Sequence, residues 1–154
     1  MNRLTWREGF TALEALIVLA FFGLLITLGA VSISNARARM RDAVRVSDVN
    51  MLRAGLSIYW HQTSAYPTSN GMTLGDTDLS DGLTLDGFVP LSQAKSPLLL
   101  ERVPQGPSSD ERYVYTGGLN GYAIRFQTER ETSLGPPNVY YMHSTGVDTN
   151  ADLK

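Results

Sequence analysis

The stretch "REGFTALEALIVLAFFGLL", residues Arg7–Leu25, decides how the rest of the sequence is interpreted. It opens an apolar run in which no charged residue occurs from Ala15 to Ala36. At about 1.5 Å per helical residue, such a run is long enough to cross a hydrocarbon core about 30 Å thick. A soluble helix is rarely apolar on all sides over this length. The run therefore predicts a membrane-spanning helix.

Glu14 is the feature of this stretch that a plain membrane anchor does not explain. A carboxylate inside a membrane span costs roughly 2.5–3.5 kcal/mol on insertion scales. A cleaved secretory signal fits poorly too, because the run is longer than the usual apolar region and Ala30-Val31-Ser32 is a poor cleavage site. A permanent signal anchor accounts for the length but leaves Glu14 without a role.

The residues around Glu14 resemble a third kind of signal, the class III signal of type IV pilins and type II secretion pseudopilins. That family has a short charged leader followed by Gly, Phe and a stretch that contains Glu. Here the chain reads Gly9-Phe10-Thr11-Ala12-Leu13-Glu14. The resemblance implies that a prepilin peptidase cuts the Gly9–Phe10 bond and methylates Phe10. It also implies that Glu14 pairs with the new amine during assembly, since either charge alone is costly in a low dielectric.

The same resemblance implies a structural role and a set of partners. The chain would be a subunit of a type IV pilus-like filament, built as a helical homopolymer of itself. Its other partners would be the prepilin peptidase, an assembly ATPase, an inner-membrane platform protein and, before assembly, membrane lipid. The expected location is a single pass through the inner, or cytoplasmic, membrane and then an extracellular or periplasmic filament.

Two alternatives to a surface pilus stay open at this point. The first, from the same family, is the major pseudopilin of a type II secretion system. The second is a monomeric, membrane-anchored binding domain, with DNA as one ligand to consider. Filament length separates a surface pilus from a secretion pseudopilus. A monomer with an intact leader would favour the membrane-anchored binding domain.

Charge is distributed unevenly along the chain. Through residue 61, seven Arg stand against four Asp and Glu, which gives +3; from residue 62 onward, six basic and eleven acidic residues give -5. Four arginines follow the apolar run: Arg37, Arg39, Arg41 and Arg45. Positive-inside counting alone places this end in the cytoplasm, whereas the family resemblance places it outside. The net charge of -2 does not favour nucleic acid as a partner.

The helix is expected to continue beyond the membrane as far as Tyr66. Val49, Leu52 and Leu56 recur at helical spacing and predict one buried face, while Asp42 and Arg45 are assigned to the opposite, solvated side. This divides the chain into four segments: a leader (1–9), a transmembrane and assembly helix (10–34), an amphipathic continuation of the helix (35–66) and a globular part (67–154).

The globular part predicts a small antiparallel sheet. Three runs resemble strands: Arg112–Thr116, Gly121–Glu129 and Asn138–Ser144. Glycines at 117 and 118 mark a hairpin turn between the first two runs. The sequence before these runs, residues 68–107, is rich in turn residues and shows no long-range periodicity of apolar residues. A sheet of three or four strands needs a helix to cover its apolar face. The predicted fold is therefore α+β, with a long N-terminal helix packed on a small antiparallel sheet.

Asp148, Asn150 and Asp152 alternate along the C-terminal tail and resemble half of a calcium loop. The glycine and the distal glutamate of an EF-hand are lacking. The major pseudopilin family binds calcium near its C-terminus, so the resemblance makes calcium the one cofactor to consider, with Asp148, Asn150 and Asp152 as ligands. The alternative is a solvated acidic tail.

The sequence contains few of the residue patterns that catalytic sites require. The chain has no Cys and two His that lie far apart in the sequence, so thiol, zinc-ribbon and Ser-His-Asp sites are not favoured. The sequence also lacks a phosphate loop and a nucleophile elbow. We therefore expect no enzymatic activity and no catalytic residue.

Overall fold

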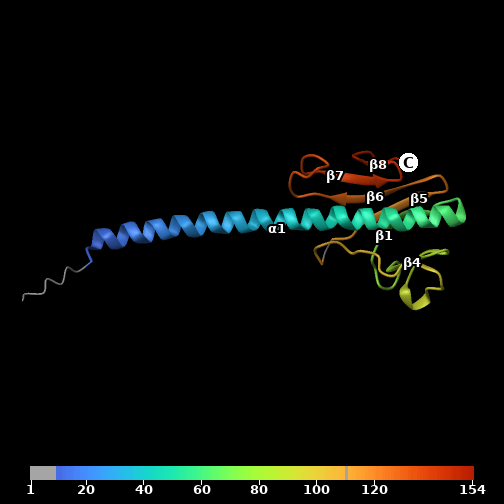
Figure 1. Ribbon diagram of the computed structural model, residues 1–154, viewed down its shortest axis with the longest axis horizontal. Coiled ribbons are helices and arrows are strands. Elements are labelled where there is room, and N and C mark those ends of the chain that lie inside the picture. The colour runs from blue at the N-terminus through green and yellow to red at the C-terminus, as the bar shows by residue number, and fades with distance from the viewer. Residues whose placement is uncertain (1–9, 110) are drawn as a thin grey trace, which may run out of the picture. The chain divides into compact units, whose positions relative to one another are not determined.

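Helix α1 (Ala12–Thr63) is the longest element of the computed structural model, which describes residues 10–109 and 111–154 (Figure 1). The chain divides into two compact units, one ending at Arg37 and one comprising Ala38–Lys154, and α1 contributes to both. We refer to residues 12–37 and 38–63 as the first and second parts of α1. No Pro interrupts the helix, and Ser64 ends it in the left-handed region with φ 57°.

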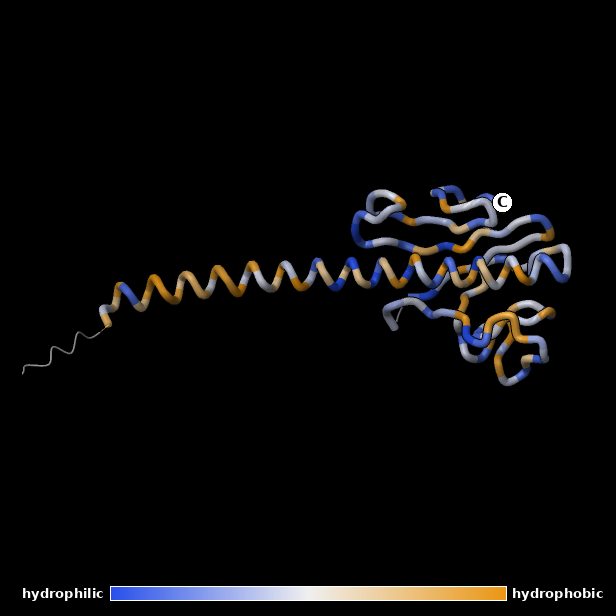
Figure 2. Tube along the Cα trace, in the orientation of Figure 1, coloured by the Kyte–Doolittle hydropathy of each residue, from blue (hydrophilic) through white to orange (hydrophobic). Residues whose placement is uncertain are grey.

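The first part of α1 is largely apolar and almost entirely exposed. Every residue from Phe10 to Ser34 is exposed, including Leu19 at 72% and Ile26 at 69%. The most apolar 18-residue window of α1 has a mean hydropathy of 2.7, and Figure 2 shows this part coloured mostly as hydrophobic. The helix is therefore long and apolar enough to cross a membrane.

The second unit contains two antiparallel sheets. The larger has the order β1-β5-β6-β7-β8, and its strands are β1 (Ser69–Thr73), β5 (Val114–Gly118), β6 (Gly121–Gln127), β7 (Val139–His143) and β8 (Gly146–Asp148). The smaller has the order β3-β2-β4, and it comprises β2 (Gly82–Thr84), β3 (Gly87–Val89) and β4 (Leu98–Leu100), with the 3-10 helix η1 (Leu91–Gln93) between β3 and β4.

The α+β class predicted from the sequence is confirmed. Strands β5, β6 and β7 overlap the three predicted runs, but the prediction of a sheet with three or four strands was wrong. The main sheet gains β1 and β8 at its edges, and a second sheet forms from strands of three residues each. A strand this short shows too little alternation to be recognised in a sequence.

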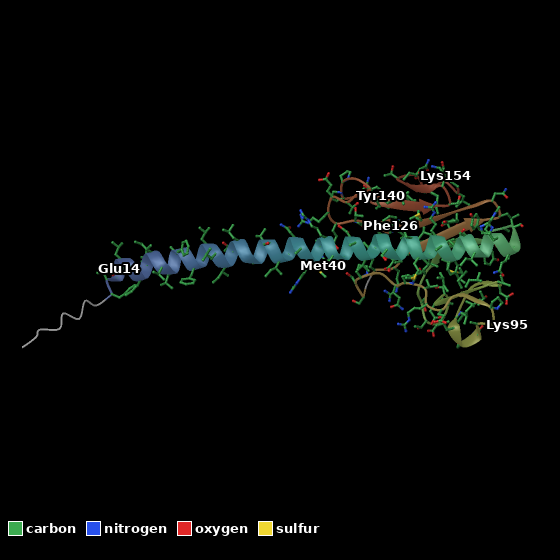
Figure 3. All side chains as sticks on the ribbon, viewed as in Figure 1. Glu14, Met40, Lys95, Phe126, Tyr140 and Lys154 are labelled. Atoms are coloured by element: carbon green, nitrogen blue, oxygen red, sulfur yellow. The ribbon has the colours of Figure 1, made fainter. Side chains whose placement is uncertain are left out.

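The core lies between the second part of α1 and the sheets. Fully buried Val49, Leu52 and Leu56 of the helix belong to one apolar cluster with side chains of the sheets. From the larger sheet and its flanks these are Tyr113, Tyr115, Tyr122, Ile124, Phe126, Tyr140 and Met142. Phe126 and Tyr140, labelled in Figure 3, bring their ring centroids within 5.9 Å of each other. The predicted buried face of the helix is thus confirmed.

Gly55 explains how closely the smaller sheet approaches the helix. A Cβ built at Gly55 would lie 2.5 Å from the Cδ1 of Leu100 in β4. A larger residue at this position would force the Leu100 side chain to shift. The glycine that weakens the helix pattern therefore marks the place where β4 packs against α1.

Candidate functional site

The N-terminus of α1 contains two of the predicted site residues, Phe10 and Glu14. Gly9, which with Phe10 forms the predicted processing site, lies outside the described residues. Phe10 is 77% exposed and directly precedes the helix cap. The Glu14 carboxylate accepts a hydrogen bond from the backbone N–H of Thr11 and another from the Thr11 hydroxyl, both at 2.9 Å. The backbone N–H of Glu14 lies 3.2 Å from the Thr11 Oγ1.

This arrangement is a capping box, in which an N-cap threonine and a glutamate three residues later satisfy each other's backbone groups. It gives Glu14 a function within its own chain that sequence reasoning missed. The signal was present as Thr11-x-x-Glu14 directly before an apolar run. The Glu14 carboxylate is bound to Thr11, the residue directly after Phe10. The nitrogen of Phe10 would become the free amine after cleavage. The predicted pairing of Glu14 with that amine stays a prediction.

The second part of α1 carries a charged cluster that the sequence assigned to the wrong face. Asp42 and Arg45 were expected on the solvated side, but they are only 1% and 5% exposed. They continue the stripe of Val49 and Leu52, because steps of three and four residues keep side chains on one face of a helix. Their burial is possible because the globular part supplies partners for both.

Asp42 accepts hydrogen bonds from the chain that follows β6. Its carboxylate accepts from the backbone N–H of Glu129 at 2.9 Å and from that of Arg130 at 2.8 Å, and it forms an ion pair with Arg45 at 2.6 Å. A buried carboxylate requires such donors to offset its desolvation. Asp42 therefore fastens α1 to the end of β6.

Arg45 connects Asp42 to two further acids. Its guanidinium forms two hydrogen bonds of 2.7 Å with Glu111 and an ion pair of 2.7 Å with Glu129. Arg41 also binds Glu129, through its Nε at 2.7 Å. The hydrogen bond from Arg41, followed by that from Arg45, lowers the pKa of Glu129 to about 2. Two of the four arginines after the apolar run are thus neutralised within the chain.

The three predicted calcium ligands lie close together, Asp148 at the end of β8 and the other two just after it, and each is already engaged. Asp148 binds the Nζ of Lys154 at 2.6 Å and lies 3.1 Å from the Nε2 of His143. Asn150 donates from its side-chain amide to Asp152 at 2.8 Å and accepts from the backbone N–H of Asp152 at 3.1 Å. Lys154 is the main cause that lowers the pKa of Asp148 to about 2. No pattern in the sequence indicates the contribution of Lys154.

Within residues 10–109 and 111–154, no group of three or more His, Cys, Asp or Glu side chains lies close enough together to hold a metal ion. Comparisons of the chain with protein-family models, with curated proteins and with solved structures found no match.

Proposed function

We propose that this chain is a structural subunit of a type IV pilus-like filament, processed between Gly9 and Phe10 and assembled through the first part of α1. The family is suggested by the Gly9–Glu14 motif, and the α+β fold of a long helix on an antiparallel sheet is compatible with it. The subunit would be anchored in the inner membrane by this helix and would then assemble with other copies of itself into a filament. A secretion pseudopilus would use the same steps.

The observation that carries this proposal is the exposure of all residues from Phe10 to Ser34. Burying one large aliphatic or aromatic side chain contributes about 1.5–3 kcal/mol, and this segment consists largely of such side chains. Within the described residues, the chain leaves them all exposed. Before assembly, lipid would bury these apolar side chains. After assembly, other copies of the helix would bury them.

The DNA-binding alternative is weakened by the charged cluster. A DNA-binding patch needs arginines that are available for phosphates. Arg41 and Arg45 bind Glu129 and Glu111 instead, so the patch expected after the apolar run loses half of its cations. Arg37 and Arg39 are exposed, but two arginines provide little attraction in a chain whose net charge is -2.

Intact-mass spectrometry of the membrane-derived protein tests the processing step. In a host with a prepilin peptidase, we expect a chain that begins at Phe10 and carries one added methyl group. Gly9→Val should leave the leader attached, because a Cβ obstructs the close approach of the peptidase to the backbone. Gly23→Ala is the matched control, since nothing lies within 4 Å of the added Cβ; it should be processed normally.

The same cells report on assembly. Sheared filaments that contain processed chains would support the pilus, and short filaments whose loss blocks protein export would support the pseudopilus. Recovery of chains that mainly start at Met1, or that are cut after Ser32, in the presence of the peptidase would overturn the processing step. Processed chains that remain monomeric in the membrane would instead overturn assembly.

A further inference from the structure

The C-terminal tail, residues 149–154, returns to the main sheet after β8. The backbone carbonyl of Lys154 lies 3.3 Å from the backbone nitrogens of Tyr122 in β6 and of Ser144 after β7, and accepts a hydrogen bond from each. Figure 3 labels Lys154 beside this sheet. The tail is therefore joined to β6 and to the turn after β7 through the backbone of one residue.

Gly121 shows how closely the tail packs. A Cβ built at Gly121 would lie 2.8 Å from the backbone nitrogen of Lys154 and 2.9 Å from its carbonyl carbon. These atoms belong to backbone, which cannot move aside as a flexible side chain can. The first residue of β6 must thus be glycine for the tail to reach its position.

The residues expected to bind calcium do not fit that ion as they are arranged. Calcium takes six to eight oxygen ligands. One oxygen of Asp148 is bound by the ammonium of Lys154, and the other lies near His143 and accepts from the backbone N–H of Asn150 at 2.8 Å. The side chain of Asn150 is bound to Asp152 in both directions. A cation of the chain itself thus occupies the Asp148 carboxylate.

From this geometry we infer that Lys154 is the internal cation that fastens the tail to the sheet through Asp148, and that it makes this attachment independent of divalent metal. The ammonium lies 2.6 Å from Asp148, and the backbone of the same residue binds Tyr122 and Ser144. One residue therefore supplies both the charge and the backbone contacts. The inference concerns the tail alone and does not depend on the proposed filament.

The chain offers a direct test, because Lys95 and Lys154 are its only lysines. The full-length protein in detergent micelles is treated briefly with an amine-acylating reagent, and the labelling of the two lysines is compared by mass spectrometry. Lys95 is exposed and serves as the internal reference. Lys154 should react about two- to fivefold more slowly, the factor that corresponds to an ion pair of this exposure.

Calcium chloride and EGTA then decide which cation holds Asp148. If Lys154 holds it, the labelling ratio stays the same in excess calcium and in EGTA. If calcium displaces the ammonium, Lys154 labels faster in calcium, and that result overturns the inference. Asp148→Asn should raise the labelling of Lys154 to that of Lys95, while Asp78→Asn, an exposed acid elsewhere, should leave the ratio unchanged.

Hydrogen exchange gives a second readout that does not rely on lysine chemistry. Lys154→Gln should increase the exchange of the Tyr122 and Ser144 amides about two- to fivefold, and Lys95→Gln should not. Gly121→Ala should expose the same amides by pushing the tail away while leaving every charge in place. Unchanged exchange in Lys154→Gln would show that the ion pair does not hold the tail.

Discussion

The two parts of α1 differ in which side chains they bury: the first part buries none, whereas the second part buries charged as well as apolar side chains. In the first part, apolar residues such as Leu19 and Phe22 are exposed without exception. In the second part, Asp42 and Arg45 are almost completely buried, while Met40 is 69% exposed. Both parts belong to one helix with the same backbone geometry. Hydropathy alone therefore does not decide which side chains of this helix are buried.

The difference lies in what each part is packed against. The second part faces sheets and loops that supply Glu111, Glu129 and two backbone N–H groups, so its charges are compensated inside the chain. A buried ion is tolerated when its partners are already in place. The apolar side chains of the first part are exposed, and the proposed function assigns their burial to lipid and to other copies of the helix.

The largest expected effect comes from the carboxylate of the first part. Glu14→Gln retains an oxygen that can accept from Thr11, so the capping box persists, but the negative charge is lost. If the charge pairs with the amine of Phe10, processing should continue while filaments disappear. Breaking such a pair costs about 3–5 kcal/mol, which corresponds to more than a hundredfold in an equilibrium. Intact mass and sheared filaments are measured in the same cells.

Thr11→Ala is the matched variant that separates capping from charge. It removes the hydroxyl that caps the helix but leaves the Glu14 carboxylate, and losing a cap costs about 0.5–2 kcal/mol. We expect filaments at reduced yield. If instead Glu14→Gln assembles normally and Thr11→Ala does not, Glu14 serves as a helix cap, and the predicted pairing of its charge with the amine of Phe10 is wrong.

The sequence was sufficient for the large elements because they carry long patterns. An apolar run without charge and a recurrence at helical spacing predicted α1, and three strand-like runs, one of them with clear alternation, predicted β5, β6 and β7. Strands β2, β3, β4 and β8 were missed because each has only three residues. Their positions depend on contacts such as Leu100 against Gly55, which join residues far apart in the sequence.

The site residues were predicted where the motif is local and missed where the partner is distant. The Thr11-x-x-Glu14 box could have been found, because its spacing is a known helix-start signal. The burial of Asp42 and Arg45 could not, since Glu111 and Glu129 lie more than 60 residues away in the chain. The charges of Asp42 and Arg45 alone suggested that this face is solvated. Only the fold shows that Glu111 and Glu129 neutralise Arg45.

The second prediction concerns the buried charges of the second part. Asp42→Ala removes the acceptor of the Glu129 and Arg130 N–H groups and one partner of Arg45. Removing one member of a buried ion pair typically costs about 3–5 kcal/mol, so the globular part should unfold at a much lower urea concentration. Tyrosine circular dichroism of the full chain in detergent follows this transition.

Asp78→Ala is the control for this measurement, because Asp78 is exposed. Substitutions at such positions usually change the free energy of unfolding by less than about 0.5 kcal/mol. An equal urea midpoint for Asp42→Ala and Asp78→Ala would show that the charged cluster does not hold α1 to the sheet. The contrast between the two parts of the helix would then need another cause.

The smallest expected effect is the acid sensitivity that Glu129 confers. Its pKa falls from an ordinary value of 4.5 to about 2 in the folded chain, chiefly because Arg41 donates a hydrogen bond to it. A carboxyl whose pKa is lowered by folding stabilises the folded state above the unfolded pKa, and this stabilisation is lost as the pH falls. The free energy of unfolding should therefore decrease between about pH 5 and pH 2.

The Glu129 side chain is 35% exposed, so solvent screens its ion pairs. Its contribution should then be near the value of a surface pair, about 1 kcal/mol or less, and smaller still at high salt. Glu129→Gln should flatten the decrease in unfolding free energy between pH 5 and pH 2, whereas Glu131→Gln, an exposed acid two residues away, should not. Parallel pH profiles for the wild type and Glu129→Gln would mean that Glu129 pairs with neither Arg41 nor Arg45 in solution, and that the charged cluster consists of Asp42, Arg45 and Glu111.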